Sequence, residues 1–244
     1  MAHVCRIPFE NVSKLLLIGR ERVGRPTRLG EFLDGIEHED LGGTCYSNNP
    51  FLVELLRALG YDADLFGADM SAPNVHTVIR VRLDEAEWHV DAGYGGPFWR
   101  PVRLDRLPET LSAGELRFVL HRSAADDIEM SLVRGESRLH GYVAHGPARS
   151  FEFFHPIILQ SFEPGQHFMT NLRLIRYFED GRAAELLNST LTVHRDGESR
   201  VLELRNRAEL RSAVADELAM PRCPIDEAVN VLERMSGQSL FQGK

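Results

Sequence analysis

The spacing of hydrophobic residues changes along the chain and divides it into three parts. In the first part, residues 49–59 place apolar side chains on one face at helical intervals, and Gly60 follows at a typical stop position. Two shorter apolar clusters, residues 15–18 and 29–33, come before it and are separated by a Gly- and Arg-rich stretch. We therefore expect a helical N-terminal part, with its clearest helix over residues 49–59.

From residue 61 onward, apolar and polar residues alternate as they do in strands. Residues 75–83 alternate with His76 opposite the apolar side, a turn follows at 84–87, and a second strand is predicted over 88–92. Further strands are predicted at residues 116–121, 128–133, 138–143 and 150–154. Short strands at such close spacing indicate an antiparallel barrel or sandwich.

The last part mixes both periods. A three-stranded meander is predicted at residues 172–178, 183–193 and 200–204, and two helices at 206–219 and 225–235. No stretch between the parts has the composition of a linker, so we expect packed subdomains. We assign them to residues 1–63, 64–160 and 161–244.

Charge and cysteine content exclude several classes of protein. With 28 Lys and Arg against 36 Asp and Glu, the net charge is −8, which disfavours binding to nucleic acid or to anionic membranes. The three cysteines are odd in number and widely spaced, so they match neither a disulfide framework nor a structural zinc site. The N-terminus has no signal-peptide pattern, and no apolar run is long enough to span a membrane. We expect a cytoplasmic protein with no bound metal.

One segment has the features of a nucleophile site. The sequence LGGTCYSNNPF places Cys45 after a two-glycine turn at or near a helix start, where free N–H groups favour a thiolate and can hold an oxyanion. His76 opens the first strand of the predicted hairpin and Asp91 ends the second, so the carboxylate can reach the imidazole. This arrangement predicts a cysteine-protease-like triad. His89 shares the strand parity of Asp91 and is an alternative base.

Four words of the sequence carry a family resemblance. RIPFEN (6–11), GGTCYSNN (42–49), the isolated Val75-His76 and VDAGYGG (90–96) occur in the order seen in arylamine N-acetyltransferases, which the chain resembles. The resemblance implies that Cys45, His76 and Asp91 form the catalytic triad. It also implies a ping-pong reaction, in which the cysteine takes an acetyl group from acetyl-CoA and an arylamine or hydrazine nitrogen attacks the thioester. The implied fold is α+β, with an N-terminal helical bundle, a central antiparallel β-barrel and a C-terminal α/β lid.

The chain departs from the family pattern at several positions. Leu41 stands where the family commonly has an arginine, and Ser47 where it has an acidic or amide residue. The PFEN word begins at Pro8, so we expect a shortened helical bundle. This bundle is either incomplete or completed by a partner, and we leave open whether the chain forms a homo-oligomer. Pro50 is expected to kink a helix from Cys45 or to delay its start to about Asn49.

Three alternatives to the acetyltransferase remain open. An amide synthase that closes macrolactams would keep the triad and take its acyl group from a carrier-bound thioester. A thiol hydrolase resembling papain or transglutaminase would use water as the acceptor, and a catalytically degenerate family member would serve as a binding module. An aromatic acceptor pocket could be lined by Phe9, Phe98 and Trp99, although Phe9 above all is a candidate for the core. Contacts to a phosphate could come from Arg100 and Arg103, whose alternative is a solvated face.

Overall fold

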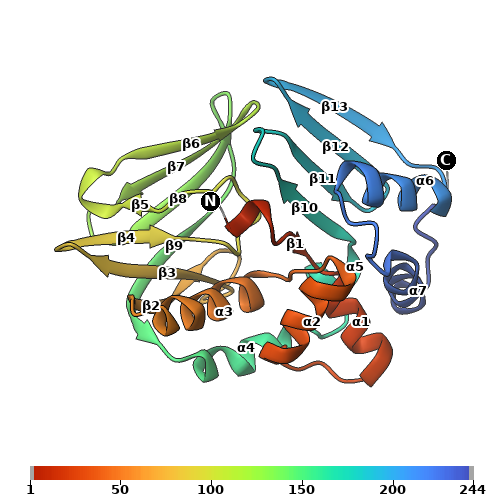
Figure 1. Ribbon diagram of the computed structural model, residues 1–244, viewed down its shortest axis with the longest axis horizontal. Helices are drawn as coiled ribbons and strands as arrows, with labels where there is room; N and C mark the ends of the chain where they lie inside the picture. Colours follow the sequence, from red (N-terminus) through yellow and green to blue (C-terminus); the bar gives the residue numbers. More distant parts are fainter. Residues whose placement is uncertain (1–2, 242–244) are drawn as a thin grey trace.

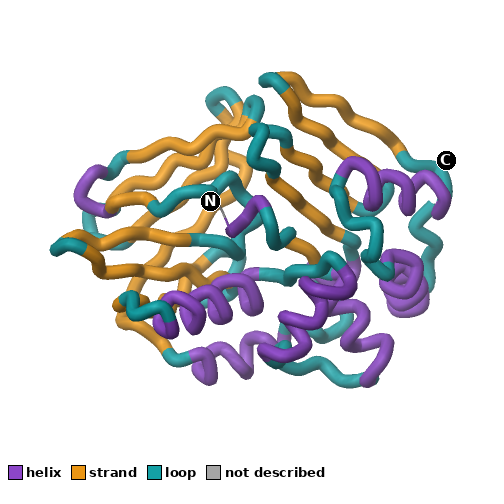
Figure 2. The backbone as a smooth tube through the Cα atoms, viewed as in Figure 1, coloured by secondary structure: helices purple, strands orange, loops and turns teal. Residues whose placement is uncertain are grey.

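The computed structural model describes residues 3–241 as an α+β fold, in which two antiparallel sheets are accompanied by helices (Figures 1 and 2). The helical elements are η1 (His3–Cys5), α1 (Val12–Glu21), α2 (Leu29–Glu39), α3 (Cys45–Ala58), η2 (Leu104–Arg106), η3 (Phe151–Phe154), α4 (His155–Gln160), α5 (His167–Thr170), α6 (Arg207–Ser212), η4 (Ala213–Glu217) and α7 (Ile225–Ser236). The strands are β1 (Phe9–Glu10), β2 (Asp62–Asp69), β3 (His76–Leu83), β4 (Ala86–Val90), β5 (Val102–Arg103), β6 (Glu109–Ala113), β7 (Leu116–Arg122), β8 (Ile128–Arg134), β9 (Ser137–Arg149), β10 (Arg173–Tyr177), β11 (Ala183–Leu187), β12 (Thr190–Arg195) and β13 (Glu198–Glu203). This confirms the α+β class.

The larger sheet is a nearly closed barrel of eight antiparallel strands. Its strand order is β5-β4-β3-β2-β9-β8-β7-β6, and it curves strongly from β3 to β6 (Figure 1). Hairpin β3–β4 pairs Ile79 with Val90, so the start of β3 and the end of β4 lie at the same edge. Helix α3 packs against β2 and β3 at this side of the barrel. The predicted antiparallel barrel is therefore confirmed.

The smaller sheet joins the two ends of the chain. Its order is β1-β10-β11-β12-β13, and β1 pairs with β10 through the register of Phe9 opposite Ile175. Helices α1 and α7 pack against each other, and their buried faces share a second hydrophobic cluster with the inner face of this sheet. The PFEN segment therefore belongs structurally to the C-terminal sheet as well as to the N-terminal helices.

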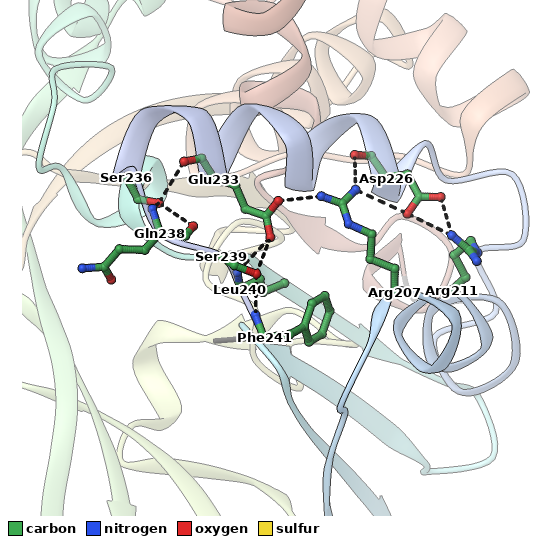
Figure 3. Close-up of polar contacts among 9 residues, drawn as sticks. All are labelled: Arg207, Arg211, Asp226, Glu233, Ser236, Gln238, Ser239, Leu240 and Phe241. Atoms are coloured by element: carbon green, nitrogen blue, oxygen red, sulfur yellow. Dashed lines mark hydrogen bonds and ion pairs between the residues drawn. The ribbon is translucent and has the colours of Figure 1, made fainter. Parts of the chain in front are cut away.

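Ion pairs fix the last helix. Figure 3 shows Arg207 of α6 reaching Glu233 of α7 at 2.6 Å and Arg211 reaching Asp226 at 2.9 Å. The second oxygen of Glu233 accepts the backbone N–H of Leu240 at 2.9 Å, which folds the following segment back onto the helix. These contacts hold α7 in place at the edge of the second core.

Some local predictions are wrong, and each has a physical reason. Residues 150–154 form the helical turn η3 rather than a strand, because β9 runs on to Arg149 and uses the pairing that a further strand would need. Residues 183–193 are two strands, since Asn188 takes a left-handed conformation with φ of 54° and turns the chain. Of the two alternatives for Pro50, a start delayed to about Asn49 is excluded, because helix α3 begins at Cys45 and carries Pro50 inside its second turn.

Candidate functional site

A close approach of backbones at the two glycines positions Cys45. A Cβ on Gly42 would lie 2.1 Å from the Pro8 carbonyl oxygen, so only glycine lets the chain pass there. Gly43 then bridges to Phe9, and its carbonyl accepts the Glu10 N–H at 3.1 Å. Cys45 follows as the first residue of α3 with 5% of its surface exposed. The thiol therefore lies at a helix N-terminus, where the helix dipole favours negative charge.

The first turn of α3 is attached to the segment that carries His76. The Thr77 hydroxyl donates to the Cys45 carbonyl at 3.0 Å, and the Tyr46 hydroxyl donates to the Asn74 carbonyl at 2.7 Å. The Cys45 thiol itself lies 3.8 Å from the Val75 carbonyl oxygen. These contacts hold the thiol beside the start of β3.

The structure brings the three sequence-predicted side chains together. The Nε2 of His76 lies 2.8 Å from the Asp91 Oδ2, and the interaction of the imidazole with the nearby Cys45 thiol adds to the rise in the pKa of His76. Because Asp91 occupies Nε2, the nitrogen left for the thiol is Nδ1. His76 and Asp91 are 2% and 1% exposed, so water does not screen their interaction.

The charges of this pair are mutually supporting. Burial alone would lower the pKa of His76, but the Asp91 carboxylate and the hydrogen bonds of the imidazole raise that pKa well above its usual range. Burial alone would raise the pKa of Asp91, and the His76 charge with several donors lowers it instead. The arrangement can therefore keep an imidazolium next to the thiol and stabilise a thiolate there.

Asn49 and Gly93 complete the site, and neither was predicted from the sequence to take part in it. The Asn49 amide donates to Asp91 Oδ1 at 3.0 Å and to the Thr77 carbonyl, while its oxygen accepts the Ala92 N–H at 2.8 Å. The Gly93 N–H donates to Asp91 Oδ1 at 2.9 Å. The signal for Asn49 was its position four residues after Cys45, which places both side chains on one helix face.

The alternative base, His89, forms its hydrogen bond with Tyr142. Its Nε2 lies 2.8 Å from the Tyr142 hydroxyl, and burial lowers its pKa to about 4. The Tyr142 ring packs against the His76 ring with centroids 4.9 Å apart, and Tyr94 meets that ring edge-on at 5.8 Å. His76 is thus enclosed by two tyrosines, and His89 is separated from the thiol by one of them.

The remaining candidates fall into the core or into ion pairs. Phe9 and Phe98 are buried in the first hydrophobic cluster, and Trp99 packs against it from the edge. Arg100 pairs with Glu109 at 2.5 Å, and Arg103 pairs with Asp105 at 2.7 Å. These arginines have carboxylate partners in the structure.

The departures from the family pattern have visible consequences. Leu41 is buried in the second hydrophobic cluster, and the buried Glu10 accepts backbone N–H groups from Ser13 at 2.8 Å and from Gly42 at 3.2 Å. Burial raises the pKa of Glu10, which these N–H groups oppose. The hydroxyl of Ser47 lies 3.3 Å from that of Thr27. The backbone N–H groups that bind Glu10 thus hold in place the turn that precedes Cys45.

A small, open pocket lies next to the same turn. Its lining includes Lys14, Thr44 and Ser47, and Cys45 is not part of it. Burial lowers the pKa of Lys14 to about 7, with the nearby Cys45 opposing the shift, and its ammonium donates to the Ser161 carbonyl at 2.6 Å. Among residues 3–241, no His, Cys, Asp and Glu group is arranged to hold a metal ion. No helix in this described part is both long and apolar enough to cross a membrane.

Comparison with known proteins gives consistent matches. The family model described as N-acetyltransferase matches residues 1–220. An arylamine N-acetyltransferase of Mycolicibacterium smegmatis is 26% identical over 231 residues, covering 90% of this chain and 82% of that protein. A Mycobacterium marinum arylamine N-acetyltransferase in complex with CoA has the same fold, with a TM-score of 0.77 at 19% identity over 96% of this chain and 89% of that one. Proansamycin X synthase of Amycolatopsis mediterranei is 33% identical over 93 residues, covering 33% of this chain and 34% of that protein.

Proposed function

The chain belongs to the arylamine N-acetyltransferase family of acyltransferases, and from this premise we propose that it moves an acetyl group from acetyl-CoA to the nitrogen of an arylamine or hydrazine. The acetyl group is carried on Cys45 as a thioester, in a ping-pong reaction. The observation that carries the proposal is the buried, hydrogen-bonded pair of His76 and Asp91 beside the Cys45 thiol at the start of α3. The CoA bound to the Mycobacterium marinum protein supports a CoA thioester as the donor.

In the first half-reaction, His76 accepts the thiol proton at Nδ1 and Asp91 stabilises the imidazolium. The Cys45 thiolate then attacks the carbonyl carbon of acetyl-CoA, and the N–H groups in the first turn of α3 face the oxyanion that forms. The tetrahedral intermediate collapses by breaking the bond to the CoA sulfur. The departing CoA thiolate takes the proton from His76, which leaves an acetyl thioester on Cys45.

In the second half-reaction, the amine nitrogen attacks the thioester carbonyl. His76 takes the proton that the nitrogen loses, so that the new amide is neutral. The bond between the carbonyl carbon and the Cys45 sulfur breaks, and the protonated His76 again faces a thiolate. The acetylated amine leaves, and the enzyme returns to its starting state.

Different parts of the chain supply the components of the site. We assign the nucleophile to the helical part, residues 1–63, the base and the carboxylate to the barrel, residues 64–160, and a covering lid to residues 161–244. The helix dipole then acts on the sulfur while the barrel fixes the imidazole. We also propose a cytoplasmic location, which the use of acetyl-CoA as donor supports.

A covalent adduct tests the proposal. When the protein meets acetyl-CoA without an acceptor, intact-mass measurement should show one added acetyl group, and peptide mapping should place it on Cys45. Addition of an arylamine should remove the adduct and yield an equal amount of acetylated amine. Absence of the adduct, or its location at Cys5 or Cys223, would contradict the proposal.

A second candidate function keeps the triad and changes the substrates. The partial match to proansamycin X synthase supports an amide synthase that takes its acyl group from a carrier-bound thioester. The two functions are separated by offering both donors to the same preparation. An adduct formed from a carrier-bound acyl thioester but not from acetyl-CoA would select the amide synthase, and rapid donor hydrolysis that amines do not affect would select a thiol hydrolase.

A further inference from the structure

His89 and Tyr142 form a buried polar pair behind the carboxylate of the site. His89 lies on β4, two residues before Asp91, which follows the end of that strand at Val90. His89 and Tyr142 are each 1% exposed, and the His89 Nε2 lies 2.8 Å from the Tyr142 hydroxyl oxygen. The other ring nitrogen, Nδ1, is buried without a hydrogen-bond partner.

The surroundings decide which nitrogen of His89 carries the proton. A proton on Nδ1 would bury a donor with no acceptor, and Nε2 would then have to accept the Tyr142 proton. With the proton on Nε2, His89 donates to the Tyr142 oxygen, and no buried N–H stays unpaired. The second arrangement satisfies both donors of the pair.

The Tyr142 phenol also interacts with the Asp91 carboxylate, which binds the same His76 ring that Tyr142 packs against. Desolvation raises the pKa of the Tyr142 phenol far above its usual range, and the charge of Asp91 and a hydrogen bond to it add to the increase. Since the Tyr142 oxygen receives the His89 N–H, its own proton is available to Asp91. With that proton directed to Asp91, a donor series runs from His89 through Tyr142 to the carboxylate.

The charged groups around His89 keep it neutral. Burial disfavours the protonated form of His89, as do His76 and Arg80 on β3, while the Asp91 carboxylate just after β4 favours it. The pKa of His89 therefore falls to about 4. Across the pH range of the reaction, His89 is therefore a fixed donor to Tyr142.

We propose that His89 is a positioning residue that acts through Tyr142: its Nε2–H holds the phenol hydroxyl toward Asp91 and so sets how firmly Asp91 binds the His76 imidazolium. The inference rests on the proposed role of Cys45, His76 and Asp91. A hydroxyl that both accepts and donates is a stronger donor than one that only donates, so it disperses more of the carboxylate's charge.

The consequence is a defined direction of change. Without the His89 donor, Tyr142 is a weaker donor, Asp91 keeps more of its charge, and the imidazolium becomes more stable. Facing His76 are Cys45 from α3, Asp91 after β4, Tyr94, and Tyr142 and His140 from β9. None of these is changed by a substitution at His89, so the transfer of the thiol proton to His76 should occur at lower pH.

The test measures the rate of Cys45 alkylation by iodoacetamide against pH. His89→Met removes the donor at similar volume, and His89→Gln keeps an N–H donor at a similar distance from the backbone. We expect His89→Met to move the alkylation midpoint down by about half a pH unit, and His89→Gln to leave it in place. In a Tyr142→Phe background, which itself lowers the midpoint, His89→Met should have no further effect.

The outcomes separate this inference from the function it rests on. Alkylation needs no acetyl donor, so a failed acetyl adduct leaves the readout intact. A wild-type midpoint that His89→Met does not move, or one that it moves equally in the Tyr142→Phe background, would overturn the inference alone. A wild-type Cys45 that reacts like a free thiol would overturn both.

The proton position can also be read without any substitution. In protein labelled with ¹⁵N-histidine, His89 should show a protonated Nε2 and a bare Nδ1 that do not change from about pH 6 to about pH 8. A protonated Nδ1, or titration within this interval, would overturn the inference even if a variant failed to fold.

Discussion

Asp91 is a buried carboxylate whose negative charge is held by hydrogen-bond donors of the site. It accepts the His76 Nε2–H at 2.8 Å, the Asn49 amide at 3.0 Å and the Gly93 N–H at 2.9 Å. These donors offset the loss of water around a buried carboxylate, which would otherwise raise its pKa. Because the folded-state pKa of Asp91 is lowered, its ionisation stabilises the fold above about pH 4, and this stabilisation is lost as the pH falls through the folded-state pKa.

Replacing this charge alone should stop the reaction with little change in shape. In Asp91→Asn the neutral amide cannot balance an imidazolium, so His76 no longer draws the proton from Cys45. We expect the rate of Cys45 acetylation to fall roughly 1,000-fold or more. The pH midpoint of Cys45 alkylation by iodoacetamide should rise toward that of a free thiol. It is measured by mass spectrometry of samples quenched at set times over a pH series.

The matched control is Asp105→Asn, which removes an exposed carboxylate paired with Arg103 at 2.7 Å. This exposed pair contributes little, so both the acetylation rate and the midpoint should stay unchanged. If Asp91→Asn acetylated as fast as the wild type, Asp91 would have no part in activating the thiol.

At the scale of elements, the site depends on how closely α3 approaches the loop after β4. A Cβ on Gly93 would lie 2.6 Å from the Cys45 Cα and 2.7 Å from the Asn49 amide nitrogen. The first of these neighbours is backbone at the start of a helix, so it cannot move without displacing the thiol. Glycine at 93 is therefore required by the contact between two elements.

Gly93→Ala should push α3 away from Asp91. We expect a loss of about 1–3 kcal/mol in the free energy of unfolding, the range for overpacking a well-packed interior, measured by urea denaturation. The acetylation rate of the folded variant should fall as well, because Cys45 moves relative to His76.

Gly30→Ala is the control for this change. Gly30 lies in α2 with nothing within 4 Å of an added Cβ, so alanine should be neutral or slightly stabilising there. Equal stability of the two variants would mean that the space at Gly93 is not restrictive.

The elements differ in how far the sequence could predict them. The β3–β4 hairpin followed from alternation, because one face of each strand is buried, and this placed His76 and Asp91 at one edge. The sequence left the start of α3 open between Cys45 and about Asn49. The bonds from the Thr77 hydroxyl to the Cys45 carbonyl and from the Tyr46 hydroxyl to the Asn74 carbonyl hold the earlier start despite Pro50. Periodicity also cannot indicate Asn49, whose role comes from three partners distant in the chain.

For the whole molecule, the turn that carries Cys45 is held between the two ends of the chain. Strand β1 pairs with β10 on one side and bridges to Gly43 on the other. No hydrophobic period predicts this, because β1 is only two residues long and its partner lies more than 150 residues away. The C-terminal sheet therefore supports the turn before Cys45 although it contributes none of the side chains of Cys45, His76 and Asp91.

Asn11 is the polar residue that secures this closure, and its removal should destabilise the whole fold. It is 0% exposed, and its amide donates to the carbonyls of Phe168 at 2.8 Å and Asn171 at 2.7 Å, while its oxygen accepts the Arg173 N–H at 2.7 Å. Asn11→Ala leaves all three backbone groups without this partner, so we expect a loss of about 3–5 kcal/mol in the urea-derived free energy of unfolding.

Asn206→Ala provides the comparison, because the exposed Asn206 caps α6 through a single bond from the Glu209 N–H at 3.0 Å. Loss of that cap should cost about 1 kcal/mol. If Asn11→Ala cost no more than Asn206→Ala, the joining of the chain ends would rest on strand pairing and apolar packing alone. A larger cost would come with faster alkylation of Cys45 in the Asn11→Ala variant at denaturant concentrations below the unfolding transition. The two results together would mean that separation of β1 from β10 exposes the turn before Cys45 while the barrel is still folded.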